Sequence, residues 1–424
     1  MADIAVQIKT LLENLLQASL PVRIRAWDRS ESGPPEAPVL IIRRRRALRR
    51  LTWEPTELGL ARAYVAGEID VEGDLYETLG RLSSLIWHAP DVSGGRPVRA
   101  IVGDLVRLGV VGTQPKPPPE EIALSGVRHS KRRDRQAVSH HYDVGNDFYR
   151  IVLGASMVYS CAYWASDDAG YSLADAQRDK LDLICRKLDL HAGKRLLDVG
   201  AGWGSLAMHA ARQYGVDVVG ITLSTEQADY ARKQVAEAGL TAHIEIRLQD
   251  YRDVDDGPFD AISSIGMAEH VGTGPYAEYA AILFRQLKAG GRLVNHQIAA
   301  IHPATQRRKK RSFIDAYVFP DGELATIGTT VSLLEVAGFE VRDVQALREH
   351  YARTLRSWVA NLEADWPDAV RLTSVGRARV WRLYMAASAL AFEQGRIGVN
   401  QVLAVKTHRD GRSDMPATRS GWLA

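Results

Sequence analysis

The sequence has few cysteines and no long apolar run. Only two cysteines, Cys161 and Cys185, occur in 424 residues. They are too few for a disulfide framework, and neither has neighbours at the spacing of a zinc site. Cys185 follows an apolar helical pattern, so we expect a small buried residue there. No stretch is apolar enough to cross a bilayer, and the N-terminus lacks the basic-then-apolar order of a signal peptide. These absences favour a cytoplasmic protein without a metal site.

The chain also lacks internal repeats, and its length favours two or three domains. Residues 1–112 are predicted to form a small α+β domain, because their segments show helical spacing or strand alternation. Helices are expected near 5–16, 58–67, 75–85 and 98–108, and strands near 22–27, 39–42 and 69–71. Prolines between Gln114 and Glu121 exclude helix and central strand. Residues 113–137 are therefore predicted to be a Pro-rich and basic linker, followed by a second domain at 138–424.

Positive charge is clustered, although the net charge is only +3. Basic residues gather in three places, at 43–50, 128–135 and 307–311. Such patches attract the phosphates of nucleic acid or of anionic lipid headgroups. Each cluster alone is also what a solvated face looks like. A phosphate-bearing partner surface is therefore one of two open interpretations.

A glycine-rich loop follows the first predicted strand of the second domain. The segment R-L-L-D-V-G-A-G-W-G spans 195–204, and its three glycines permit a tight turn that approaches a ligand closely. A dinucleotide fingerprint would need its third glycine at Ser205. Asp198, two residues before the first glycine, instead suits the cationic end of S-adenosylmethionine (SAM). The remaining alternative is a simple glycine-rich turn.

Strands and helices alternate from this strand and loop onward. Strands are expected near 196–199, 216–221, 244–248, 261–264 and 293–297, and helices near 205–214, 225–238 and 276–287. Late strands at 339–347 and 401–407 follow a basic and aromatic insertion at 301–324, and 358–393 is mostly helical. The alternation is typical of a doubly wound α/β sheet with ligands at the carboxyl ends of its strands. We predict a Rossmann-like, seven-stranded class I SAM methyltransferase domain.

Aromatic and polar residues are concentrated ahead of the first strand of that domain. They occur in H-H-Y-D-V-G-N-D-F-Y from His140 and in M-V-Y-S-C-A-Y-W from Met157. This mixture is unusual for a plain helix, so we expect a lid or pocket wall in front of the cofactor. His140 or His141 alone is better explained as a hydrogen-bonded structural residue.

Eight segments, in one order, resemble the cyclopropane-fatty-acyl-phospholipid synthases and the related mycolic acid cyclopropane synthases. They are H-Y-D-V-G-N-D-F-Y from His141, Y-S-C-A-Y-W from Tyr159, L-D-V-G-A-G-W-G from Leu197, G-I-T-L-S from Gly220, Q-D-Y-R-D from Gln249, M-A-E-H-V-G from Met267, Y-V-F-P-D-G from Tyr317 and H-Y-A-R-T-L-R-S-W from His350. The resemblance runs from about residue 140 to the C-terminus. The N-terminal domain is a looser match to the longer bacterial members.

The resemblance implies a set of SAM contacts. They would be made by Tyr159, Ser160, Asp198, Gly200, Gly202, Trp203, Gly204, Thr222, Leu223, Gln227, Gln249, Asp250 and Tyr251. Thr222 and Gln227 would lie on the ribose side of the cofactor, and Gln249 to Tyr251 near its adenine.

The resemblance also implies a bound bicarbonate ion that acts as the base. Main-chain groups of Cys161 and Ile298 and the side chains of Glu269, His296 and Tyr351 would hold it. Each side chain has an ordinary interpretation too, because Glu269 could cap a helix, His296 could be a satisfied buried histidine and Tyr351 could pack at a helix start. Their joint occurrence at matched positions favours the functional interpretation.

The implied reaction explains why such a residue set is needed. A cis double bond is a weak nucleophile, so the methyl group must come from a strong electrophile, which a sulfonium supplies. Transfer leaves a carbocation, and the site must exclude water and remove a proton. The aromatic faces of Tyr163, Tyr317 and Phe319 are expected to stabilise the cation by about 0.5–2 kcal/mol. Some family members have a cysteine where this chain has Ser388, and a reaction without a protein–methyl intermediate does not need one.

The resemblance therefore predicts an enzyme that methylenates unsaturated acyl chains of membrane phospholipids. A same-family alternative loses a different proton and gives a methylene-branched chain. Two further alternatives are a soluble small-molecule methyltransferase and a non-catalytic lipid-binding protein with a relic cofactor loop. We expect no nucleic-acid partner. The N-terminal domain at 1–112 and the basic clusters would provide peripheral contact with the inner face of the plasma membrane. A homodimer is a candidate by family analogy alone.

Overall fold

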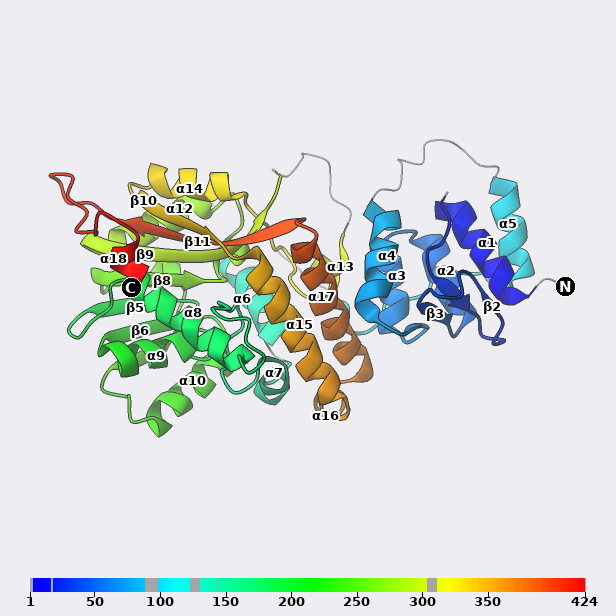
Figure 1. Cartoon of the computed structure of the whole chain (residues 1–424), viewed down its shortest axis with the longest axis horizontal. Helices are drawn as coiled ribbons and strands as arrows, with labels where there is room; N and C mark the ends of the chain where they lie inside the picture. The colour runs from blue at the N-terminus through cyan, green and yellow to red at the C-terminus, as the bar shows by residue number, and fades with distance from the viewer. Residues whose placement is uncertain are drawn as a thin grey trace. The chain divides into compact units, whose positions relative to one another are not determined.

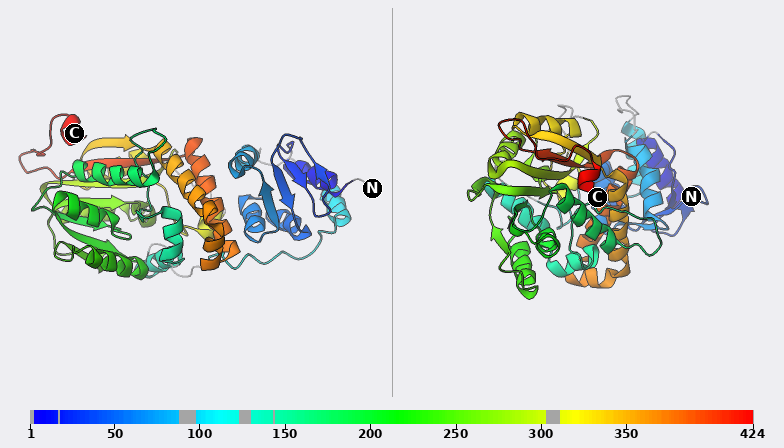
Figure 2. Two further views of the ribbon diagram at one scale, coloured as in Figure 1. Left: turned by 60° about the horizontal axis from the view of Figure 1, so that its bottom comes forward. Right: turned by 60° about the vertical axis from the view of Figure 1, so that its left-hand side comes forward.

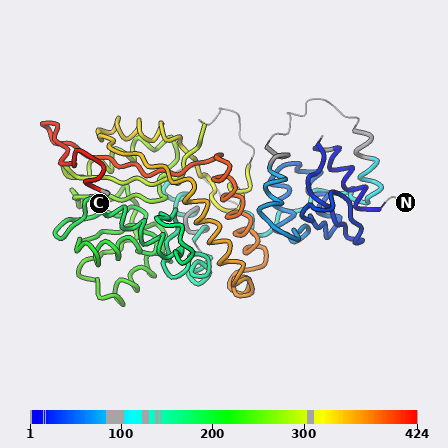
Figure 3. The backbone as a smooth tube through the Cα atoms, viewed as in Figure 1, coloured from blue at the N-terminus to red at the C-terminus, as the bar shows by residue number. Residues whose placement is uncertain are grey.

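The structure is a computed structural model that describes residues 3–16, 18–87, 98–122, 130–142, 144–302 and 311–423. The chain divides into two compact units, and Figure 3 follows the backbone through both. Unit 1 comprises Met1–Ala123, Arg308–Val318 and Thr373–Leu390. Unit 2 comprises Leu124–Arg307, Phe319–Leu372 and Ala391–Ala424.

Unit 1 contains the α+β elements predicted near the N-terminus. Its sheet has the order β2-β1-β3-β4, with β1 (Arg23–Arg25), β2 (Glu31–Ser32), β3 (Val39–Ile42) and β4 (Ile69–Glu72). Its first helices are α1 (Ile4–Leu16), α2 (Arg45–Trp53), α3 (Glu57–Val65), α4 (Leu75–Trp87) and α5 (Val98–Arg107). Helix α2 lies in a segment for which the sequence predicted only a basic cluster. Ala47 and Leu48 form the apolar part of the buried face of this arginine-rich helix.

Two later segments join unit 1, although the predicted first domain ends at residue 112. They carry α13 (Phe313–Tyr317) and most of α17 (Val375–Glu393). Arg379 of α17 accounts for part of this association. Its guanidinium donates to the carbonyl oxygens of Tyr64 and Ile69, each at 2.7 Å, and lies 4.1 Å from the centre of the Tyr64 ring. Such long-range contacts have no local sequence signal.

The predicted linker at 113–137 is helical at its end. Helix α6 (Lys131–Tyr142) begins inside it. Lys131 and Arg133 form ion pairs of 2.5 Å with Asp253 and Asp321 of unit 2. In the sequence these basic residues resemble a solvated tract. In the structure their ion pairs attach the start of α6 to other parts of unit 2.

Unit 2 is built on a seven-stranded sheet of order β10-β11-β9-β8-β5-β6-β7 (Figure 1). The strands are β5 (Arg195–Val199), β6 (Asp217–Thr222), β7 (Ile244–Leu248), β8 (Phe259–Ile265), β9 (Leu287–Ala300), β10 (Glu340–Ala346) and β11 (Ile397–Val405). Strand β11 is antiparallel to both neighbours, and the pairs from β9 to β7 are parallel. This sheet confirms the predicted fold class.

Helices cover both faces of the sheet, as the two directions of Figure 2 show. Neighbouring strand residues serve opposite cores, and Val218 and Val219 are one such pair. The first core includes α8 (Leu173–Lys187), α9 (Ser205–Tyr214), α10 (Thr225–Glu237) and α18 (Ser420–Leu423). The second includes the turn η1 (Tyr251–Asp253), α11 (Ala268–Val271), α12 (Tyr276–Gln286) and α14 (Ile327–Val336). Burial on both faces explains the nearly continuous apolar runs of the parallel strands.

Three further helices of unit 2 are α7 (Asn146–Leu153), α15 (Arg348–Ala364) and α16 (Trp366–Leu372). Helix α15 packs on α7, and Asn361 Nδ2 donates to the Val152 carbonyl at 3.0 Å. Among the described residues, no helix has the length and apolar character needed to cross a membrane. The same residues contain no group of three or more His, Cys, Asp or Glu side chains suited to a metal ion.

Candidate active site

The glycine-rich loop lies at the carboxyl end of β5. Gly200, Gly202 and Gly204 have φ values of +82°, +55° and +82°, which residues with a Cβ rarely adopt. The amides of Gly200 and Ala201 donate to the Ile221 carbonyl at 3.0 and 2.9 Å. The loop is therefore tied to β6 and leaves room for a ligand beside its backbone.

A cavity opens beside this loop, and most of the predicted cofactor residues line it. They are Tyr159, Ser160, Asp198, Gly200, Gly202, Trp203, Thr222, Leu223, Gln227, Gln249 and Tyr251. Gly204 and Asp250 are not among the lining residues. A Cβ at Gly204 would lie 3.2 Å from that of Ala231, so this glycine permits close packing of α9 and α10. Asp250 accepts a 2.8 Å hydrogen bond from Arg252 Nε instead.

The aromatic stretch ahead of β5 forms a wall of the cavity, as predicted. Tyr142 of α6 and residues 157–160 line it. Trp203 is fixed from this side, because its indole nitrogen donates to Asn146 Oδ1 at 2.7 Å and its ring lies 4.7 Å from that of Tyr149. The His141 ring stacks on Tyr159 at 5.5 Å, which agrees with a structural role. The side chain of His140 lies outside the described residues.

Asp198 and Lys180 bring opposite charges to the same cavity. Asp198 accepts a 2.7 Å hydrogen bond from Ser263 Oγ, and Lys180 Nζ donates to Ser160 Oγ at 2.9 Å. Burial raises the pKa of Asp198 to about 6, although Ser263 and Lys180 oppose the shift. Burial lowers the pKa of Lys180 to about 8. A buried carboxylate and a buried ammonium fit the amino-acid end of SAM, which carries both signs of charge.

The predicted cofactor residues at and after the ends of β6 and β7 form a connected group. Thr222 Oγ1 donates to Gln227 Oε1 at 2.8 Å, and the main-chain amide of Gln249 donates to the main-chain carbonyl of Thr222 at 3.1 Å. The Tyr251 ring packs edge-on against Tyr279 at 5.3 Å. The positions predicted for the ribose and adenine sides are therefore in contact with each other in the lining of the cavity.

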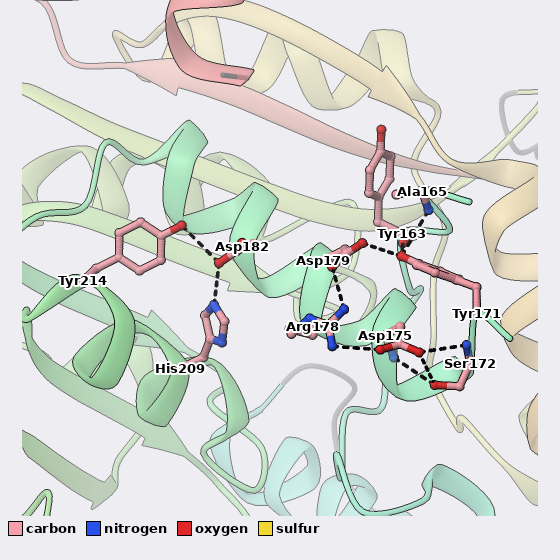
Figure 4. Close-up of polar contacts among 10 residues, drawn as sticks. All are labelled: Tyr163, Ala165, Tyr171, Ser172, Asp175, Arg178, Asp179, Asp182, His209 and Tyr214. Carbon is pink, nitrogen blue, oxygen red and sulfur yellow. Dashed lines mark hydrogen bonds and ion pairs between the residues drawn. The ribbon is translucent and has the colours of Figure 1, made fainter. Parts of the chain in front are cut away.

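The sequence analysis missed Lys180, as well as Gln177, which donates to the Ser160 carbonyl at 3.0 Å. Both lie on the buried face of α8, together with Ile184 and Lys187. The available signal was a series of polar residues three or four positions apart within an apolar stripe. Figure 4 shows polar contacts of the same helix that include the Ser172–Asp175 capping box and the Arg178–Asp175 ion pair.

A second polar cluster lies behind the cavity wall, around Glu269. Strand β8 ends with Ile265 opposite His296, which leaves the next amides of β9 unpaired on that side. Glu269 of α11 takes one of them, because its Oε1 accepts from the Ile298 amide at 2.7 Å. The predicted anion ligand Ile298 therefore holds the carboxylate here. Glu269 Oε2 is buried and makes no hydrogen bond within the described structure, and burial raises the pKa of this carboxyl to about 7.

His296 lies in β9 and is 2 % exposed. Its Nδ1 is 3.2 Å from Gln401 Nε2, whereas its Nε2 is buried without a hydrogen-bond partner in the described part of the chain. Burial lowers the pKa of His296 to about 3, and the charges of Lys180 and Lys187 act in the same direction. His296 is therefore a neutral imidazole with one nitrogen unused.

Cys161 and Tyr351 meet at the carbonyl of Leu347. This oxygen accepts from the Tyr351 amide at 3.1 Å and lies 3.6 Å from Cys161 Sγ. The Leu347 amide in turn donates to Val399, which pairs with Ile298 across β9 and β11. The structure thus connects Cys161, Ile298 and Tyr351 near the ends of β9 and β11, through the Cys161 thiol and the Tyr351 main-chain amide and not through the groups predicted to hold an anion. Burial raises the pKa of the Cys161 thiol far above its usual range, which disfavours the reactive thiolate.

The three aromatic residues predicted to stabilise a cation make contacts outside the cavity lining. Phe319 is 4.3 Å from His141 and 5.5 Å from His270, a cavity-lining residue. Tyr163 stacks on His350 at 5.1 Å. Tyr317 belongs to unit 1, where its hydroxyl donates to Glu121 at 3.2 Å. None of the three lines the cavity described above.

The sheet order, the loop and the cavity define a SAM-dependent methyltransferase. Comparison with known proteins then gives the family. The family model "Mycolic acid cyclopropane synthetase" matches residues 129–402. The chain belongs to this family and is a SAM-dependent C-methyltransferase.

Relatives of this chain carry two kinds of names. Probable fatty acid methyltransferases of Mycobacterium tuberculosis and Pseudomonas putida are 42% and 40% identical, over 93% and 94% of this chain and 93% and 95% of theirs. The cyclopropane-fatty-acyl-phospholipid synthase of Escherichia coli is 36% identical over 70% of this chain and 76% of its own. The mycolic acid cyclopropane synthase CmaA1, solved with SAH and CTAB, is 36% identical with a TM-score of 0.60 and covers 64% of this chain and 97% of its own.

Proposed function

We propose that this enzyme adds the methyl carbon of SAM to the cis double bond of an unsaturated phospholipid acyl chain and forms a cyclopropane ring. One observation carries the proposal. In the described structure, Glu269 Oε2 and His296 Nε2 are buried without partners, next to the segment 265–267 that lines the cofactor cavity. A carbocation on an acyl chain must lose a proton from carbon, which requires a base shielded from water.

SAM supplies an electrophilic methyl group in this reaction. The π electrons of the double bond form the new carbon–carbon bond as the sulfur–methyl bond breaks, and the other alkene carbon becomes positive. Removal of a proton from the transferred methyl group frees its C–H electron pair to close the ring. The residues of this chain exclude water and hold the base.

We propose bicarbonate as that base, bound between Glu269 and His296. The ion has one hydroxyl donor and anionic acceptor oxygens. Glu269 Oε2 accepts and an N–H at His296 Nε2 donates, so the two unpartnered atoms match it. The nearby charges of Lys180 and Lys187, which lower the pKa of His296, favour an anion at this place.

A second candidate is methyl transfer that gives a methylene-branched acyl chain. The relatives named probable fatty acid methyltransferases favour it, because they match over more than nine-tenths of both chains. The same cofactor, cation and base serve both outcomes. For the methylene-branched product, a hydride shifts from the methyl-bearing carbon to the cationic carbon, and the methyl group then loses a proton to form the exocyclic double bond.

We also propose that unit 1 contacts the surface of an anionic membrane. Trp53, Val106 and Val111 are 54%, 62% and 61% exposed. The Trp53 indole donates to the Gly112 carbonyl, which brings this ring next to Val111. Arg49 donates to Val110 in the same place. An exposed tryptophan beside valines and arginine fits a lipid headgroup region.

The decisive experiment is incubation of the purified chain with methyl-labelled SAM and vesicles of cis-monounsaturated phospholipid, followed by NMR and mass analysis of the released acyl chains. High-field cyclopropane protons on a chain one carbon longer are expected. An exocyclic vinylidene signal would favour the branching reaction. Labelled SAM bound without transfer to lipid would contradict the acyl-chain proposal.

A further inference from the structure

A line of buried polar groups leads from α8 to His296. Gln401 of β11 lies directly opposite His296 in the register of β9 and β11, and its Nε2 is 3.2 Å from His296 Nδ1. Lys187 Nζ donates to Gln401 Oε1 at 2.9 Å and to Gln345 Oε1 at 2.6 Å. Gln401 and Lys187 are both fully buried. The histidine therefore has a fixed neighbour on its inner nitrogen.

The donor and acceptor roles of these side chains fix the direction of each hydrogen bond in the line. Burial lowers the pKa of Lys187 to about 8, which still leaves an ammonium at neutral pH. An ammonium can only donate, so the Gln401 atom facing it must be the amide oxygen. The amide nitrogen of Gln401 then faces His296 and can only donate to it. His296 Nδ1 must accept, and the proton of a neutral imidazole must reside on Nε2.

The charges around His296 keep the ring neutral. Lys180 and Lys187 are the charged side chains that act on it, and both disfavour a second positive charge there. The carboxylate of Asp343 lies 3.9 Å from Lys187 Nζ and belongs to the far end of the line. Protonation of Nδ1 would also place an N–H against the donating amide of Gln401.

We propose that Lys187 and Gln401 act as positioning residues that hold His296 in its Nε2–H tautomer. This makes His296 a hydrogen-bond donor to the base and excludes it as the base itself. The inference rests on the proposed function for its purpose, since the donated hydrogen bond would orient a bound anion whose hydroxyl is accepted by Glu269. The tautomer itself follows from the contacts alone.

The first test is NMR of the full-length chain with ¹⁵N-labelled histidine, with the His296 signals assigned by their absence in His296→Gln. We expect a protonated Nε2 and an unprotonated Nδ1, unchanged across neutral pH. A protonated Nδ1 in the wild-type protein would overturn the proposal. This readout needs no turnover, so it is independent of the lipid assay and separates failure of the tautomer from failure of the proposed function.

The second test reverses the direction of the line. Gln401→Glu offers His296 an acceptor and should move the proton to Nδ1, raise the pKa of the ring and lower kcat by about 100-fold, with KM for SAM unchanged. Gln345→Glu is the matched control, because it makes the same change beside Lys187 but has no contact with His296. It should keep the wild-type tautomer and near wild-type kcat. An unchanged tautomer and kcat in Gln401→Glu would contradict the proposal.

Lys187→Met provides a variant that adds no charge. It frees Gln401 to rotate, and we expect a mixture of both His296 tautomers with a smaller loss of kcat. Thermal unfolding and SAM affinity are measured alongside for all variants. A fall in kcat with the tautomer unchanged would assign these residues a merely structural role.

Discussion

Two buried carboxyl groups of unit 2 have raised pKa values. The cause of the shift is the same in both, but different groups oppose it. Burial raises the pKa of both Asp198 and Glu269. Asp198 is opposed by the Ser263 hydroxyl and by Lys180, whereas Glu269 is opposed by main-chain amides, chiefly that of Ile298. The resulting pKa is about 6 for Asp198 and about 7 for Glu269. Burial therefore brings both carboxyl groups closer to neutral pH than their ordinary pKa values.

Glu269 should make folding stability depend on pH. Its pKa rises from 4.5 to about 7 on folding, so its contribution is fully present below the unfolded pKa and is lost as the pH rises through the folded one. Glu269→Gln removes this dependence. In urea unfolding, the stability of the variant relative to wild type should increase by up to about 3 kcal/mol between about pH 5 and pH 8. If the stabilities of wild type and Glu269→Gln change in parallel over this pH range, the expectation is contradicted. Turnover of Glu269→Gln should be nearly abolished.

Substitution of Ser388 tests whether the reaction needs a protein-bound methyl intermediate. It lies in α17, at a position where some family members have cysteine. The proposed reaction passes the methyl group directly to the alkene, so Ser388→Ala should keep near wild-type turnover in the labelled-SAM assay. Near-total loss of turnover in a folded Ser388→Ala protein would refute a direct transfer.

At the scale of elements, the sequence predicted what local pattern encodes. The central strands of unit 2 and the turn at Gly200 were predicted from apolar runs and glycine spacing, because both signals lie within a few residues. Helix α2 was missed because its buried Ala47 and Leu48 stand among arginines. The contact between His296 and Gln401 was missed because it depends on the register of two strands 105 residues apart. No local pattern contains that register.

Helix α8 carries Lys180 in the lining of the cavity and Lys187 in the line of groups that leads to His296. Substitution of Lys180 tests the part of this helix in SAM binding. Lys180→Met keeps the length of the side chain but removes the charge beside Asp198 and the hydrogen bond to Ser160. The loss of a charged, buried hydrogen bond should weaken SAM binding by about tenfold or more, measured by calorimetry. Arg178→Met, at a side chain 59% exposed on the same helix, is the control and should bind SAM normally. Equal affinities of the two variants would show that Lys180 has no part in cofactor binding.

At the scale of the molecule, positive charge is less available than the sequence suggests. In the first cluster, Arg43 pairs with Asp70, and Arg46 and Arg50 both pair with Glu68. In the third, Arg311 pairs with Glu121. The rest of the third cluster, 307–310, lies outside the described residues. These ion pairs show that arginine clusters also hold unit 1 together, so a membrane-binding surface has to be sought where apolar side chains are exposed as well.

The exposed Trp53 gives the membrane proposal a specific test. Full-length protein is sedimented with vesicles that contain anionic phospholipid, at rising salt. Insertion of the ring between headgroups should contribute about 1.5–3 kcal/mol, so Trp53→Ser should lower the vesicle affinity by about tenfold or more. Val336→Ser, at an 81% exposed position of unit 2, is the control and should bind like wild type. Salt should weaken the binding of all three proteins, because the neighbouring arginines act through screened charge. If Trp53→Ser and Val336→Ser bind alike, the membrane contact lies elsewhere on the chain.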